Sequence, residues 1–255
     1  MAGVRTTNPK YDELSPKWAR CSDCVDGQDA LHAKGEAYIP KLTDEEPSAY
    51  AARLKRSDFY NATWRTIAGL TGMAFRKPPV TSVPAAIEPM LDDINLAGVA
   101  LDDAAKMMVE DMLEYGCYGL MVDHPPMPEN VTAMSQAAAE ANGLRPIIQY
   151  YEIESVTNWR YARIGNVWRL SMVTLKEEAD IAEDEFSHKT EDRWRVLDLI
   201  PNAQGIMTYR VRVFRINAKG EDEQVGDDVF PLMGGRPMSY LPFRIVGDLD
   251  EPPLI

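Results

Sequence analysis

Apolar residues recur at helical spacing in two stretches of the first half of the chain. In the first stretch they line one face of a helix and are Tyr60, Trp64, Ile67, Ala68, Thr71 and Phe75. Pro78 and Pro79 follow and end this helix. The second stripe consists of Leu101, Ala105, Met108, Met112 and Tyr115. Gly116 is its expected C-terminal stop, so the pattern predicts two amphipathic helices.

Capping residues and prolines indicate where further helices begin and end. Thr43 and Glu46 form a capping box at the start of a helical region, and Pro47 allows a start one turn later. Asp102 or Asp103 is the expected cap of the second helix. Shorter helices are expected over residues 21–33, 85–97 and 130–142, whereas residues 1–20 look extended.

After Leu144 the apolar pattern changes to that of β-strands. Strands are expected over residues 146–153, 167–175, 193–200, 208–216 and 239–246. Between residues 209 and 213 the apolar Tyr and Val side chains alternate with Arg210 and Arg212, so one face is apolar and the other cationic. The residues that follow read as a hairpin turn, and the charge run over residues 176–192 reads as an exposed excursion.

The order of these elements, helices first and strands second, is typical of an α+β fold. We expect a helix-rich region over residues 1–143 and a strand-rich region over residues 144–255. The final residues, from Glu251 to Ile255, resemble the start of a helix with proline in its favoured first turn. We therefore expect the chain to be a fragment that ends where a longer helix begins.

The charge balance narrows the classes of function. Asp and Glu number 40 against 27 Lys and Arg, which gives a net charge of −13. Tight nucleic-acid binding needs a clustered cationic excess, so it is not expected over the general surface. An acidic surface repels phosphate backbones and suits a wall past which DNA slides. No apolar run is long enough to span a membrane, and three cysteines do not indicate a disulfide-built secreted fold.

The motifs for catalysis and metal binding are weak. Cys21, Cys24 and His32 are the nearest approach to a zinc site, but a fourth ligand at a sensible spacing is missing. Asp123 and His124 lie at a strand end without a nucleophile motif, and the chain lacks a glycine-rich phosphate loop. We therefore expect no enzyme activity, no metal and no cofactor.

Paired aspartates leave one enzymatic alternative open. Such pairs occur at residues 92–93, 102–103 and 227–228, and could bind Mg²⁺ for a nuclease reaction. Adjacent carboxylates on a helix point apart, and two of the pairs fall at expected helix caps, which favours a capping role.

Aromatic residues alternate with arginines in one part of the strand-rich region. The candidate contact residues in this part are Trp159, Arg160, Arg163 and Arg169. Such a mixture can stack on single-stranded nucleic acid, and it is also typical of protein–protein interfaces. Because the whole chain is acidic, we favour the interface.

The order of short motifs resembles that of the portal proteins of tailed phages, a family formerly described as a phage domain of unknown function. The resemblance covers nearly the whole chain, and the order and spacing of individually weak motifs carry it. The matching positions are Trp18; Asp26-Gly27; Gly35 with residues 38–41; Tyr50 and Arg53; residues 59–61, Gly69, Gly72 and residues 75–79; Asp93-Ile94 and Gly98; residues 114–116, 119–123 and Pro125; Tyr151 and residues 157–159; residues 195–197; and residues 241–243 and 252–254.

This resemblance implies a ring, usually a dodecamer, at one vertex of the virion capsid, assembled in the host cytoplasm. Double-stranded DNA passes through its channel. Terminase and later the head–tail adaptor dock on it, and the major capsid or scaffolding protein surrounds it. The helix-rich region would be wing-like and the strand-rich region would include the clip, with the stem helix and crown missing. Arg210, Arg212 and Arg215 are the candidates for transient phosphate contact, and the alternative is another virion component, such as an adaptor or minor capsid protein, without catalysis.

Overall fold

The computed structural model describes residues 3–125 and 143–249, and within them the fold is α+β, with helices first and antiparallel sheets second. The general class predicted from the sequence is therefore confirmed. The helix expected over residues 130–142 and the helix start expected from residue 251 lie outside the described residues.

The first helix begins much earlier than expected. Helix α1 spans Pro9–Asp26, and the Asn8 side chain accepts a hydrogen bond from the amide of Lys10 at its start. Gly27, with φ of 87°, separates α1 from helix α2, Gln28–Lys34. The prediction of an extended residue range 1–20 and one helix over 21–33 was therefore wrong. Asn8 followed by proline in the first turn was the overlooked start signal.

The long helical region expected from Thr43 is two helices. Helix α3 spans Pro47–Arg56, one turn later than the capping box predicted, with its proline in the first turn. Helix α4 spans Ala62–Ala74, and Asn61 caps it by accepting a hydrogen bond from the amide of Trp64. The Asn61 amide also donates to the carbonyl of Val25 on α1, which ties the start of α4 to the first helix.

Helix α5, Leu101–Tyr115, ends at Gly116 as predicted, since Gly116 adopts the left-handed conformation with φ of 79°. Its N-cap is Ala100 rather than an aspartate, and Asp102 and Asp103 lie in the first turn. The short helix expected over residues 85–97 is reduced to the 3₁₀ turn η2, Glu88–Met90. Two further 3₁₀ turns are η1, Gly35–Ala37, and η3, Ile153–Ser155.

Two antiparallel sheets and one short hairpin contain the strands of the described chain. The smaller has the order β10-β1-β2, with β1 (Cys117–Asp123) between β2 (Ile147–Glu152) and β10 (Phe243–Gly247). The larger is a meander of β3 (Val156–Ile164), β4 (Val167–Ala182), β5 (His188–Pro201), β6 (Met207–Ile216) and β7 (Asp222–Gln224). Strands β8 (Leu232–Met233) and β9 (Arg236–Pro237) form a separate short hairpin that turns at Gly234 and Gly235.

The core lies between these two sheets. Val173, Leu175 and Leu197 from the large sheet pack in one cluster with Met121 and Ile245 from the small sheet, and all five are almost completely buried. Trp18 of α1 joins the same cluster, so the first helix is anchored to the sheets by an aromatic side chain. Gly119 in β1 is required by this packing, because a Cβ there would lie 2.7 Å from the ring of Phe243.

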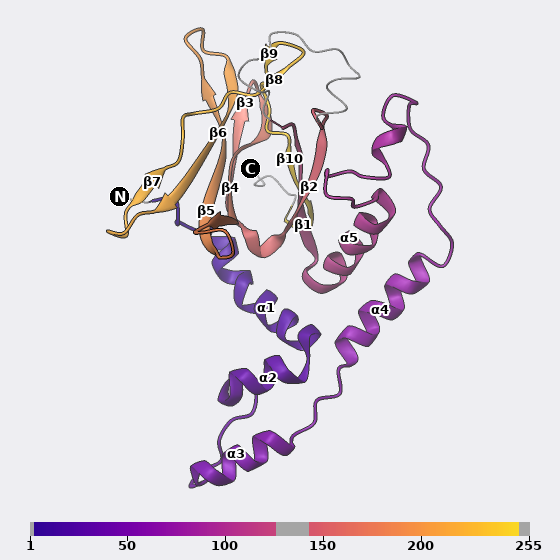
Figure 1. Cartoon of the computed structure of the whole chain (residues 1–255), viewed down its shortest axis with the longest axis vertical. Helices are drawn as coiled ribbons and strands as arrows, with labels where there is room; N and C mark the ends of the chain where they lie inside the picture. The colour runs from indigo at the N-terminus through magenta and orange to yellow at the C-terminus, as the bar shows by residue number, and fades with distance from the viewer. Residues whose placement is uncertain (1–2, 126–142, 250–255) are drawn as a thin grey trace.

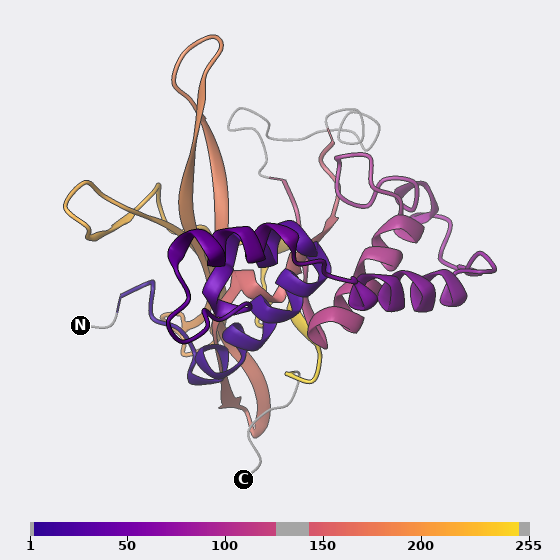
Figure 2. The ribbon, with the colours of Figure 1, turned by 90° about the horizontal axis from the view of Figure 1, so that it is seen from below.

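Two segments project from this two-sheet body. In Figure 1, helices α1, α2 and α3 run downward away from the sheets, and α4 returns toward α5. Figure 2 shows the long β4–β5 hairpin projecting in a different direction from α4. The pairing of β4 with β3 stops at Leu175, and that of β5 with β6 stops at Arg193. Residues 176–192, the charge run, therefore form an exposed two-stranded arm. Its exposure agrees with the prediction, but β4 and β5 extend further than the strands that were expected.

Candidate functional site

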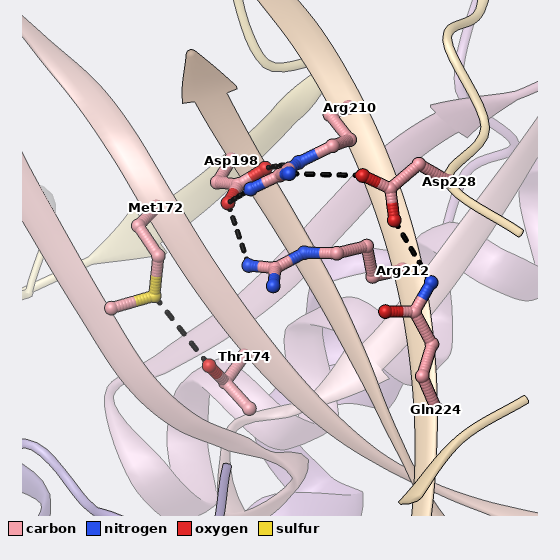
Figure 3. A network of polar contacts seen from close by, with 7 residues as sticks. All are labelled: Met172, Thr174, Asp198, Arg210, Arg212, Gln224 and Asp228. Atoms are coloured by element: carbon pink, nitrogen blue, oxygen red, sulfur yellow. Dashed lines mark hydrogen bonds and ion pairs between the residues drawn. The ribbon is translucent and has the colours of Figure 1, made fainter. Parts of the chain in front are cut away.

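Asp198 is the centre of a polar cluster on one face of the large sheet (Figure 3). The strand register places Asp198 of β5 directly opposite Arg210 of β6. The guanidinium of Arg210 donates to both carboxylate oxygens, from Nε at 2.9 Å and from Nη2 at 2.7 Å. This fork-to-fork geometry is the strongest form of the arginine–carboxylate pair, and it fixes Arg210 against the sheet.

Arg212 and Asp228 extend the cluster along the sheet. Arg212 donates from Nη2 to Asp198 at 2.8 Å, and Arg210 donates from Nη1 to Asp228 at 2.9 Å. The amide of Gln224 donates to the other oxygen of Asp228, also at 2.8 Å. The hydrogen bond from Gln224, followed by Arg210, lowers the pKa of Asp228. Asp228 therefore stays charged at neutral pH and holds Arg210 from the side opposite Asp198.

The cationic face expected on strand β6 is thus neutralised within the chain. The structure corrects the expectation of an exposed row of arginines, since Arg210 and Arg212 are half-buried and bound to Asp198, which is 8% exposed. Arg215 pairs with Glu223 at 3.0 Å at the exposed end of the strand. A phosphate group would have to displace these carboxylates before it could bind the arginines, so the paired side chains are poor candidates for a DNA contact.

The second group of candidate contact residues, on β3 and β4, includes both buried and exposed side chains. Trp159 is 8% exposed and belongs to the core, so its ring is not accessible to a partner. Arg160 and Arg163 of β3 and Arg169 of β4 are exposed, and none has an ion pair within the described part of the chain. Strand pairing places Arg163 opposite Trp168, next to the pair of Ala162 with Arg169. These three arginines are therefore the candidates that remain available to a partner.

An acidic cluster lies where α5 meets the small sheet. Burial, followed by the charges of nearby glutamates, raises the pKa of Asp111 to about 7. Burial also raises the pKa of Glu114 and Glu154 in the same region. One carboxylate oxygen of Asp111 is buried without a hydrogen-bond partner among the described residues. Asp111 therefore binds a proton close to neutral pH, which makes stability depend on pH in this range.

The weak catalytic motifs do not converge in space. Cys21 and Cys24 are free thiols, and the Nε2 atom of His32 lies 3.0 Å from both the carbonyl and the hydroxyl oxygen of Ser57. Asp123 faces Arg195 at 3.8 Å. Across residues 3–125 and 143–249, no three His, Cys, Asp or Glu side chains are placed to hold a metal ion.

A feature that sequence analysis did not identify is the exposure of helix α4. Its sequence is mostly apolar with Arg65 as its one charged residue, and such a helix is normally buried on most sides. Here Ile67 and Thr71 are buried, while Trp64 is 46%, Leu70 41% and Met73 67% exposed. The helix packs on α1 and α5 along one side and leaves an apolar surface without a partner in the described chain. The sequence carried this signal for Leu70 and Met73, which lie outside the predicted stripe, whereas Trp64 belongs to that stripe and its exposure was not predicted.

Comparison with known proteins adds no relative. No family model matches the chain, and no curated protein matches it. None of the described helices has the length and apolar character needed to cross a membrane.

Proposed function

We propose that this protein is a portal subunit of a tailed phage, one copy in a ring at a capsid vertex through which double-stranded DNA enters and leaves. The order of short motifs along nearly the whole chain supports this function. In the proposal, terminase and the head–tail adaptor dock on the ring in turn, and the capsid or scaffolding protein surrounds it. The protein then acts by its shape and surface charge within the virion and catalyses no reaction.

The observation that carries the proposal is the exposed apolar surface of α4. Trp64, Leu70 and Met73 together place large side chains in solvent on a helix with one charged residue. Leu70 and Met73, three residues apart, lie on the same side of the helix, and exposed apolar surface of this kind marks a site of association. A subunit built to stand beside further copies explains why these side chains are uncovered among the described residues of one chain.

The charge distribution is consistent with a channel that lets DNA move. The net charge is −13, and the arginines of β6 are neutralised by carboxylates of the same chain. An acidic surface repels the DNA backbone, so it opposes tight binding during passage. The exposed Arg160, Arg163 and Arg169 remain as positions for weak, salt-sensitive contacts with phosphates or with a neighbouring protein.

Negative-stain electron microscopy of the intact gene product tests this function. The proposal predicts closed rings with a central hole after purification from cells that co-express the capsid protein. Particles that dock onto capsids or tails without a central hole would support the alternative of an adaptor or minor capsid component. Lone particles without a hole under all assembly conditions would contradict the portal function.

A further inference from the structure

The chain separates its charges into two exposed segments that lie apart in one copy. The hairpin arm, residues 176–192, carries eight acidic residues and two lysines. The helical segment over residues 53–77, which includes α4, carries six basic residues and one acidic residue. This basic segment stands out in a chain whose net charge is −13.

The charged groups at the ends of both segments are available to a partner. Glu183 and Glu185 lie exposed at the tip of the arm, beside Phe186, which is 89% exposed. Arg76 and Lys77 lie exposed just beyond the C-terminus of α4. None of these four charged groups forms an ion pair with another described residue.

The tip of the arm is rigid enough to present these groups. The carboxylate of Asp184 accepts hydrogen bonds from the amides of Phe186 and Ser187, both at 2.8 Å. Below the tip, Lys176 pairs with Asp192 at 2.9 Å across the two strands. The arm is therefore a formed hairpin with an aromatic residue held at its end.

We infer that the hairpin arm of one copy docks on α4 of the next copy, with Phe186 against the exposed apolar side chains and the tip carboxylates facing Arg76 and Lys77. This inference rests on the proposed ring and names the contact that joins its subunits. The two surfaces are different, so copies join head to tail, and such an interface closes into a ring when the rotation between copies is suitable. Opposite charges select this partner, and the apolar contact supplies buried area.

Charge reversal on each side tests the contact in sedimentation velocity and native mass spectrometry of the full chain. The arm variant is Glu183→Lys with Glu185→Lys, and the helix variant is Arg76→Glu with Lys77→Glu. Each variant alone is expected to weaken self-association at least about tenfold, since like charges then face each other. A control with the same change in net charge as the arm variant is Glu36→Lys with Asp227→Lys, at exposed positions outside both surfaces. It is expected to assemble as the unchanged chain does.

Mixing the two variants separates this contact from other modes of association. In an equimolar mixture the intact arm meets an intact helix end and the reversed arm meets a reversed helix end, so both contacts join opposite charges and assembly is expected to return with the two variants alternating. Placing all four substitutions in one chain is expected to restore assembly.

Assembly of both single variants at the unchanged level would overturn this contact and leave the portal function standing, whereas a chain that is monomeric at every concentration would contradict both. The helix variant could lose assembly while the arm variant assembles normally. This result would show that α4 binds a surface other than the hairpin arm, and it would also overturn the inference. Unchanged urea midpoints in the variants exclude a loss of folding as the cause.

Discussion

Asp198 determines whether the arginines of the neighbouring strand β6 form an exposed cationic face. Without it, Arg210 and Arg212 would present the cationic face that the alternating sequence of β6 predicts. With it, both guanidinium groups are bound within one sheet at 2.7–2.9 Å. An ion pair of this kind is costly to break from one side, because the remaining charges stay half-buried without a partner.

The substitution Asp198→Asn is expected to lower the free energy of unfolding by about 2–3 kcal/mol, because Arg212 loses its carboxylate and Arg210 keeps only Asp228. Urea unfolding followed by circular dichroism measures this change. Glu223→Gln, which breaks the exposed pair with Arg215, serves as the control and is expected to leave the urea midpoint unchanged. Equal effects from the two substitutions would show that the Asp198 cluster is not a structural element.

A second residue-scale prediction concerns pH. Burial raises the pKa of Asp111 from its ordinary 3.8 to about 7, so between these values the folded chain holds a proton that the unfolded chain releases. This contribution to stability is greatest at acidic pH and is lost as the pH rises through about 7. The raised pKa values of Glu114 and Glu154 act in the same direction.

We therefore expect the free energy of unfolding to be about 1–2 kcal/mol lower at pH 8 than at pH 5, after allowance for solvent screening. Asp111→Asn is expected to reduce this difference. Urea titrations of both chains at the two pH values supply the measurement. Stability that rises from pH 5 to pH 8 would show that Asp111 is ordinarily ionised in the folded chain.

At the scale of elements, the hairpin arm and the two-sheet body have separate roles. Residues 176–192 pair across β4 and β5 and with no other strand, so the arm adds little to the core. The arm also explains why the charge run looked irregular from sequence, since a two-stranded ribbon has no buried face to impose alternation.

Replacing residues 180–190 with Asn-Gly joins the paired residues Ala179 and Glu191 by a two-residue turn. The shortened chain is expected to keep its urea midpoint and lose self-association. Sedimentation velocity on matched samples compares the two properties. A shortened chain that fails to fold, or that assembles normally, would contradict the separation of arm and body.

Sequence patterns predicted the elements that bury one face and missed those defined by local geometry or by long-range pairing. The stripe of α5, its stop at Gly116 and the alternation in β6 were readable because each has a periodic apolar side. Helix α1 was missed because its cap lies in a polar segment, and the division of the Thr43 region depends on Asn61 binding the distant Val25. The pairing of Asp198 with Arg210 depends on strand register, which residue types along one strand do not specify.

At the scale of the whole molecule, a two-sheet body carries a helical arm and a hairpin arm that point in different directions (Figure 2). The exposed apolar helix, the acidic hairpin and the internally neutralised arginines together favour a subunit that is completed by its neighbours. The exposed apolar side chains of α4 and the projecting hairpin arm each have a role in the proposed ring. In the proposed ring, the acidic surface charge has the role of keeping passing DNA mobile, and the arms have the role of joining the subunits.

Native mass spectrometry of the intact gene product measures the central claim most directly, because a closed ring has one fixed number of subunits. We expect a single dominant assembly whose mass is one whole multiple of the subunit mass and does not grow with protein concentration. A monomer at every concentration, or an open series of oligomers that lengthens without limit, would contradict the account.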